Sequence, residues 1–200
     1  MTASVTNELA ERRKNLAEAR LYEAQAKSEE RRERNIESRV LFFNSDVDED
    51  TVGFAVEQLH DLELESDEPI TVVLNSPGGE VFSGLLLFDT LRRSSANIVT
   101  ITRGLGASMG SYLAQAGDVR LVSPNSWYMV HEPTSIAWGK AGDIKREAKM
   151  LERLHDQLLD ILAERSTLSK ADIKRRCADK DWWMSAAEAL EHGFFDGYDE

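Results

Sequence analysis

The sequence has few of the features that mark secreted, disulfide-bonded or metal-binding proteins. Cys177 is its only cysteine, so no internal disulfide can form, and no cysteine or histidine accompanies it at the spacing of a zinc site. No apolar run approaches the roughly 20 residues that a membrane-spanning helix needs, and the first residues lack the apolar stretch of a signal peptide. We therefore expect a cytoplasmic protein that uses no metal or other cofactor and binds no membrane.

Basic residues are also scarce. The 24 Lys and Arg residues face 36 Asp and Glu residues, which gives a formal net charge of −12. Residues 1–39 are almost balanced, with nine basic residues against eight acidic ones, whereas residues 40–200 hold 15 against 28. Because so acidic a surface repels phosphate groups, we do not expect a nucleic acid as partner.

The N-terminal segment is rich in Glu, Arg, Lys and Ala, and residues 5–38 contain neither proline nor glycine. Intrinsic propensity therefore predicts a helix there. Its apolar residues are sparse and keep no sustained heptad, so a coiled coil is disfavoured. We expect a charged helical arm over residues 1–38, either solvated or packed against another subunit or partner.

The remaining residues, 39–200, are sufficient for one domain with a sizeable core. Apolar patterns predict strands at 39–43, 69–74, 97–102, 118–122 and 127–131, and helices at 51–62, 81–93 and 111–116. Alternation of strands and helices is typical of an α/β fold with a parallel sheet.

A serine lies on a glycine-rich turn between a predicted strand and a predicted helix. Ser108 is flanked by Gly106 and Gly110, and such a turn exposes the hydroxyl where a nucleophile would be placed. The pattern is short, and an ordinary turn with a helix-capping serine accounts for it equally well. Other residues must decide between these interpretations.

Two further segments carry chemical signals. Gly78 and Gly79 follow a buried strand, where paired glycines can turn backbone N–H groups toward an anion, although many turns use Gly-Gly only for its conformational freedom. His131 ends a predicted strand and precedes a loop, which suits a general base, whereas a lone histidine is more often structural. His155 and His192 are weaker candidates, because one lies within a helix and the other at a helix end.

Taken together, these motifs resemble those of the Clp protease proteolytic subunit family. Residues 75–79, Asn-Ser-Pro-Gly-Gly, look like the family's oxyanion turn, and residues 106–110, Gly-Ala-Ser-Met-Gly, look like its nucleophile turn. Residues 124–126 and 129–133 look like the segment that carries its catalytic histidine. The resemblance covers roughly residues 39–199.

The resemblance implies a serine peptidase with a Ser-His-Asp triad. It assigns the nucleophile to Ser108, the base to His131 and the third member to Asp181, which precedes an apolar pair and the start of a helix. Asp179 is the nearest rival for the third role. The resemblance also assigns the oxyanion amides to Gly79 and Met109.

The implied fold is α/β, a ClpP/crotonase-like spiral of repeated β-β-α units with a protruding handle helix at 141–164. The implied assembly is a homo-oligomer of stacked rings, heptameric in the family, whose triad is aligned only when rings meet through the handle. Polypeptide substrates would be cleaved inside the chamber of this assembly.

The charged arm and the Trp182-Trp183 pair resemble phage-encoded members of the family that act in capsid maturation. Two kinds of protein partner therefore stay open: an AAA+ unfoldase, or phage capsid and scaffold proteins. Three other functions also stay open: a crotonase-like acyl-CoA enzyme, an α/β-hydrolase esterase, and a non-enzymatic scaffold. The esterase is disfavoured because its triad follows the order Ser, acid, His.

Overall fold

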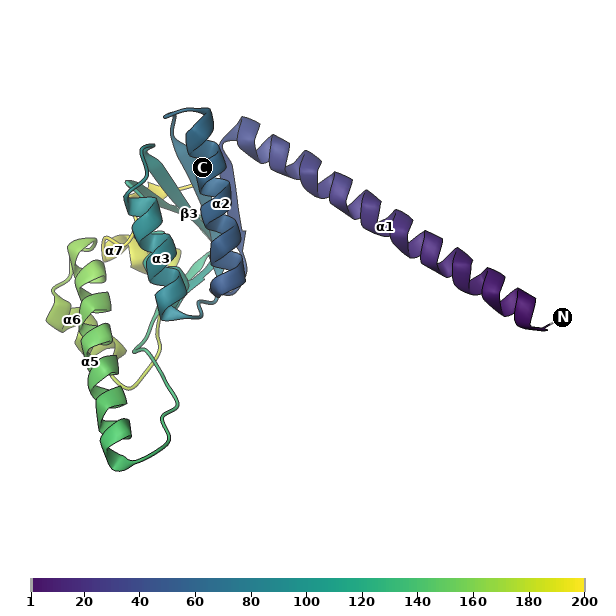
Figure 1. The fold of residues 1–200 in the computed structure, drawn as a ribbon. Coiled ribbons are helices and arrows are strands. Elements are labelled where there is room, and N and C mark those ends of the chain that lie inside the picture. Colours follow the sequence, from purple (N-terminus) through teal and green to yellow (C-terminus); the bar gives the residue numbers. More distant parts are fainter. Residues whose placement is uncertain (1, 200) are drawn as a thin grey trace. The chain divides into compact units, whose positions relative to one another are not determined.

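The computed structural model describes residues 2–199, with the side chains of residues 11–27 and 29–199. The chain divides into two compact units, of which the first runs to Arg39 and the second begins at Val40. The first unit is the long helix α1, Thr2–Ser38, as predicted (Figure 1). The side chains described in α1 are almost all exposed, including Leu16, Leu21 and Tyr22. No helix among residues 2–199 combines the length and apolar character needed to span a membrane.

The second unit alternates strands with helices, which confirms the predicted α/β fold. In chain order its elements are β1 Val40–Asn44, α2 Glu49–Glu65, β2 Ile70–Ser76, α3 Val81–Arg92, β3 Ile98–Ala107, α4 Met109–Ala114, β4 Val119–Val122, β5 Trp127–Val130, α5 Ala141–Glu164, α6 Lys170–Cys177, β6 Trp182–Ser185, α7 Ala186–Glu191 and β7 Gly197–Tyr198.

Five strands form a parallel sheet in the order β1-β2-β3-β4-β7. Strand β3 is longer than predicted, and along one of its edges it pairs with two different strands. Its first half pairs with β4, and residues 105–107 pair with β5 instead. Between the two halves lies Gly104, whose φ of 89° is a conformation that suits glycine. The β5 strand in turn pairs with β6, which runs antiparallel to it.

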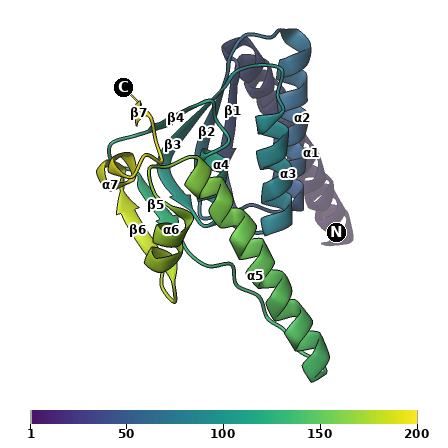
Figure 2. The ribbon, with the colours of Figure 1, turned by 90° about the vertical axis from the view of Figure 1, so that its left-hand side faces the viewer.

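Helices α2 and α3 lie side by side along the sheet (Figures 1 and 2). Asp48 caps α2, because its carboxylate accepts a hydrogen bond from the Thr51 N–H at 2.8 Å. The buried face of α2 holds Val52, Ala55, Leu59 and Leu62, which recur at helical spacing. The largest fully buried aliphatic side chains of the unit include Leu41, Leu59, Leu62, Ile70, Leu74, Leu87 and Leu113.

Helix α5 spans the residues expected for the handle helix, and Figure 2 shows it extending away from the sheet. Its C-terminal half is buried within the unit through Leu154, Leu158, Leu159 and Leu162. Residues 141–150 are all exposed, including Ile144 and Met150, whose exposed fractions are 42% and 46%. The apolar stripe of α5 is therefore longer than the part that its own unit covers.

Candidate active site

Ser108 lies between the end of β3 and the start of α4, as the glycine-rich pattern predicts. Its backbone has φ 51° and ψ −125°, a conformation that a residue with a side chain rarely adopts. Such a conformation costs on the order of 1–3 kcal/mol and persists only where the surroundings hold it. The Ser108 N–H donates a hydrogen bond to the Met129 carbonyl at 2.9 Å, which ties the turn to β5.

Close packing against a second turn also holds the serine in place. A methyl group on Gly78 would lie 2.5 Å from the Ser108 Cβ and 2.7 Å from the Met109 nitrogen. Gly78 itself has a φ of 98°. Both the conformation and the close approach therefore require glycine at this position. The Gly-Gly turn and the Ser108 turn are therefore packed directly against each other.

The amide of Gly79 is left free by the pairing of this turn with Val47. The Val47 N–H donates to the Gly78 carbonyl, and the Glu80 N–H donates to the Val47 carbonyl. Because successive N–H groups in an extended segment point to opposite sides, the Gly79 N–H points away from Val47. Among residues 2–199, neither the Gly79 nor the Met109 N–H donates a hydrogen bond. Both amides remain available for an acceptor outside the chain.

His131 follows β5 directly, and its Nε2 atom lies 2.7 Å from the Ser108 Oγ atom. The side chain of His131 is 26% exposed. On the other side of the ring, Nδ1 lies 3.5 Å from the Asp181 Oδ1 atom. This second distance suits an ion pair and is longer than an ordinary hydrogen bond.

The β5–β6 ladder explains why these two residues meet. In its register Trp127 stands opposite Ser185, and Met129 stands opposite Trp183. Continuing the same antiparallel register by two residues brings His131 opposite Asp181. Since alternate residues of a strand share one face, both side chains lie on the face that carries Met129 and Trp183.

The other predicted candidates lie elsewhere. Asp179 has a φ of 56° in the turn that follows α6, whereas the carboxylate near His131 is that of Asp181. His192 packs against the Trp182 ring, with the ring centroids 5.4 Å apart. His155 is buried on α5, where its Nδ1 atom lies 3.8 Å from the Glu132 Oε1 atom. Burial lowers the pKa of His155, although Glu132 opposes that effect.

A buried polar network behind the site was not visible in the sequence. The Arg120 guanidinium, itself bound to Asp196, donates to the Gln115 Oε1 atom at 2.9 Å. The Gln115 amide donates to the Tyr128 hydroxyl, which in turn donates to the Ser111 carbonyl in α4. The network thus connects the C-terminal segment to the helix that follows Ser108. Arg120 and Asp196 are 76 residues apart in the sequence, so only the folded chain brings them together.

The described residues offer no group of three or more His, Cys, Asp or Glu side chains that could hold a metal ion.

Comparisons with known proteins show to which family the chain belongs. The model of the Clp protease family matches residues 23–198. The ATP-dependent Clp protease proteolytic subunit of Bacteroides fragilis is 37% identical over 163 residues, which are 79% of this chain and 77% of that protein. The chain therefore belongs to the Clp protease family.

Proposed function

We propose that this protein is a serine endopeptidase with Ser108 as its nucleophile. The observation that carries the proposal is the 2.7 Å contact between the Ser108 Oγ and His131 Nε2 atoms. At that distance the imidazole accepts the hydroxyl proton as the oxygen attacks a peptide carbonyl. His131 then donates the proton to the leaving amine. In the second half of the reaction His131 again acts as the base, and water releases the acyl group from Ser108.

Asp181 is proposed as the third member of the triad. Its carboxylate faces the Nδ1 side of His131, where it favours the tautomer with the proton on Nδ1 and stabilises the imidazolium that forms. The 3.5 Å separation requires only a small movement to become a hydrogen bond. Catalytic hydrogen bonds are often long in the free enzyme and shorten when substrate binds.

The Gly79 and Met109 amides are proposed to bind the oxyanion. Both lack an acceptor within the described chain, and the Gly78 turn brings the two backbones together. Removing one such donor in serine peptidases costs about 10²–10³ in turnover, so this contribution is large.

Two of the alternatives fit the geometry less well. An esterase of the α/β-hydrolase type places its acid between serine and histidine in the chain, whereas Asp181 follows His131. A crotonase-like enzyme needs oxyanion amides but no serine, so it leaves the Ser108–His131 contact unexplained.

We propose further that the chain assembles into stacked rings that enclose the active sites. The exposed apolar half of α5 supports this, since exposed apolar surface of this kind often marks subunit contacts. The relative from Bacteroides fragilis is named as one subunit of a protease. Heptameric rings are the arrangement we propose.

The partner is proposed to be either an AAA+ unfoldase or a phage capsid or scaffold protein. The charged helix α1 and the Trp182-Trp183 pair support a phage head maturation protease. Cleavage of a folded capsid or scaffold protein without any added ATPase would support the phage role. A requirement for an unfoldase and ATP would support the other partner.

The test of the catalytic proposal is hydrolysis of a fluorogenic peptide by the Ser108→Ala variant. We expect turnover to fall by about 10⁴–10⁶, because only the nucleophilic oxygen is removed. Ser95→Ala is the control, since Ser95 is exposed in the loop before β3. This variant should hydrolyse the peptide at the wild-type rate. Circular dichroism and light scattering check that both variants fold and assemble alike. Undiminished hydrolysis by a folded Ser108→Ala protein would contradict the assignment.

A further inference from the structure

The peptide unit that joins Ser108 to Met109 carries the Met109 N–H at one end and the Ser108 carbonyl at the other. Ser111 donates to that carbonyl twice, through its N–H at 2.9 Å and through its Oγ atom at 2.6 Å. Because a trans peptide is planar and its C=O and N–H point in opposite directions, a hydrogen bond that fixes the carbonyl also fixes the direction of the N–H. The side chain of Ser111 therefore acts on an amide that we assign to the oxyanion.

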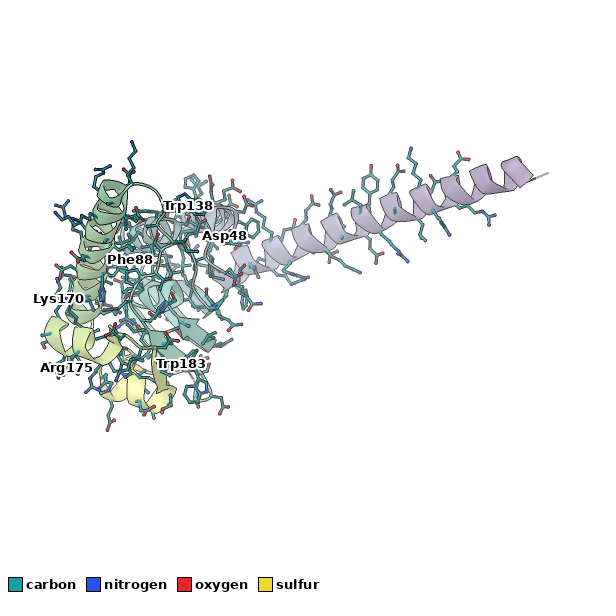
Figure 3. All side chains as sticks on the ribbon, turned by 90° about the horizontal axis from the view of Figure 1, so that it is seen from below. Asp48, Phe88, Trp138, Lys170, Arg175 and Trp183 are labelled. Atoms are coloured by element: carbon teal, nitrogen blue, oxygen red, sulfur yellow. The ribbon has the colours of Figure 1, made fainter. Side chains whose placement is uncertain are left out.

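A serine within a helix often returns its hydroxyl to a carbonyl one turn earlier, so this contact alone is ordinary. Here, however, the carbonyl belongs to the candidate nucleophile. Ser111 is also completely buried on α4, in a unit whose side chains crowd together around the sheet (Figure 3). Because a hydrogen bond in the interior is stronger than one in water, the loss of this hydroxyl should affect the Ser108 carbonyl directly.

Ser111 is itself held by a series of buried hydrogen bonds. Its carbonyl accepts the Tyr128 hydroxyl at 2.8 Å, and that hydroxyl accepts the Gln115 amide at 3.0 Å. The Gln115 Oε1 atom accepts the Arg120 guanidinium, so the series starts at a cation and each bond polarises the next. Burial raises the pKa of Tyr128, which therefore keeps its proton for the bond to Ser111.

The Gly79 amide has a different kind of anchor. Its peptide unit ends in the Gly78 carbonyl, which accepts the Val47 N–H at 2.8 Å. Both partners of that bond are backbone groups, so replacing a side chain leaves the bond in place. The Ser111 hydroxyl, in contrast, can be removed by one substitution. The anchor of the Met109 amide can therefore be tested separately from that of the Gly79 amide.

We propose that Ser111 is a positioning residue for the oxyanion, whose hydroxyl holds the Ser108–Met109 peptide so that the Met109 N–H points at the oxygen of the tetrahedral intermediate. The inference rests on the proposed peptidase function and adds a residue that does not touch the substrate. A donor that is fixed before the reaction stabilises the charge of the transition state more than the neutral carbonyl of the substrate. The role therefore affects kcat and not KM.

The first test is steady-state hydrolysis of a fluorogenic peptide by the Ser111→Ala variant. We expect kcat to fall about five- to tenfold, because one buried hydrogen bond is lost, while KM changes by less than about twofold. Ser111→Cys repeats the test without leaving an empty space and should show the same loss, since a thiol donates only weakly. A wild-type kcat in either variant would overturn the proposal.

Thr100→Val is the matched control. Thr100 is also completely buried, and its Oγ1 atom donates to the Ala114 carbonyl at 2.8 Å, at the other end of the same helix. This variant should lose about as much stability to heat as Ser111→Ala and keep kcat within about twofold of the wild type. An equal loss of kcat in the two variants would overturn the proposal, since Ser111 would then act only by stabilising the fold.

The second test replaces the reaction by a tetrahedral adduct. A peptide aldehyde forms it when the Ser108 Oγ atom bonds to the aldehyde carbon, the carbonyl oxygen becomes an oxyanion and His131 takes the proton. Ser111→Ala should weaken inhibition by the aldehyde about five- to tenfold. Inhibition by the matching peptide alcohol, which forms no adduct, should stay unchanged. Equal weakening of both inhibitors, or of neither, would overturn the proposal.

The two proposals fail in different ways. A wild-type protein that neither cleaves the peptide nor binds the aldehyde more tightly than the alcohol would overturn the peptidase function, and the role of Ser111 with it. An active wild type whose Ser111→Ala variant keeps both its kcat and its affinity for the aldehyde would overturn the role of Ser111 alone.

Discussion

At the scale of single residues, the site depends on a few side chains that the backbone holds in demanding conformations. Ser108 occupies a strained backbone conformation, and Gly78 packs against it at a distance that excludes any side chain. His131 and Asp181 gain their positions from the register of a ladder, not from neighbouring sequence. The side chain of Asp181, the proposed third member of the triad, is 54% exposed.

The third member of the triad can be tested by comparing two aspartates. Asp181→Asn should lower turnover on the order of 10⁴, because an amide cannot stabilise the His131 imidazolium as a carboxylate does. Asp179→Asn should change turnover less than about threefold, since asparagine also tolerates the positive φ of this turn. Steady-state hydrolysis of one fluorogenic peptide measures both variants. Similar losses in the two variants would leave the third member unassigned.

Two glycines differ sharply in their surroundings. Gly78→Ala should lower both the melting temperature and the hydrolysis rate, because the new methyl group would overlap the Ser108 turn. Gly53→Ala is the control, since nothing lies within 4 Å of a methyl group at that helical position. It should raise the free energy of unfolding by about 0.5–1 kcal/mol and leave hydrolysis unchanged. Thermal denaturation followed by circular dichroism compares them, and a stable, active Gly78→Ala would argue against close packing of the two turns.

These residues also show how far the sequence could predict the site. The Ser108 turn was predictable because its strand, its glycines and its helix are contiguous. The third member was not predictable from the residues alone. Asp179 and Asp181 are two residues apart, so in a strand they would lie on the same face, and both stand near Trp182. Only the register between β5 and β6, some fifty residues apart, brings Asp181 opposite His131. The resemblance to the family had already favoured Asp181.

At the scale of elements, β3 and α5 differ most from what local patterns indicate. The apolar alternation predicts a strand that ends at Thr102, whereas β3 continues through Gly104 and Gly106 to Ala107. Glycines weaken a strand signal, yet here Asn75 supports the extension by accepting the Leu105 N–H at 3.0 Å. The strand β6 was missed, although Ser185 and Glu188 form a capping box that marks the start of α7.

Helix α5 shows that an apolar stripe alone does not tell an interface from a core. Leu158 belongs to the apolar stripe of α5, but it is only 2% exposed and lies in the core of its own unit. A charge there would unfold the subunit. The positions that test assembly are the exposed ones, Ile144 and Met150.

We expect the double variant Ile144→Glu and Met150→Glu to reduce the size of the assembly and to lower peptide hydrolysis with it. The reason is that carboxylates cannot be buried in an apolar subunit contact without a large desolvation cost. Gln157→Glu adds one negative charge at an exposed position of the same helix and should leave the assembly intact. Light scattering and peptide hydrolysis are measured on the same fractions. A fully active single subunit would contradict both the assembly and its link to catalysis.

At the scale of the whole molecule, the two units have different characters. The first is a single charged helix whose described side chains are almost all exposed, and composition alone was sufficient to predict it. The second unit holds all the residues proposed for catalysis, and its charge accounts for the acidity of the chain. The family model begins its match at residue 23, within α1, so the family likeness extends into this helix.

We propose that Ser108 is a nucleophile activated by His131, and covalent labelling can test this activation without a peptide substrate. The intact protein is treated with a fluorophosphonate, weighed by mass spectrometry and digested to locate the adduct. We predict one phosphonyl group per chain on Ser108, and a labelling rate at least about 10³-fold lower in His131→Ala because the base is lost. An unlabelled protein, an adduct on another serine, or equal labelling of the His131→Ala variant would contradict the claim.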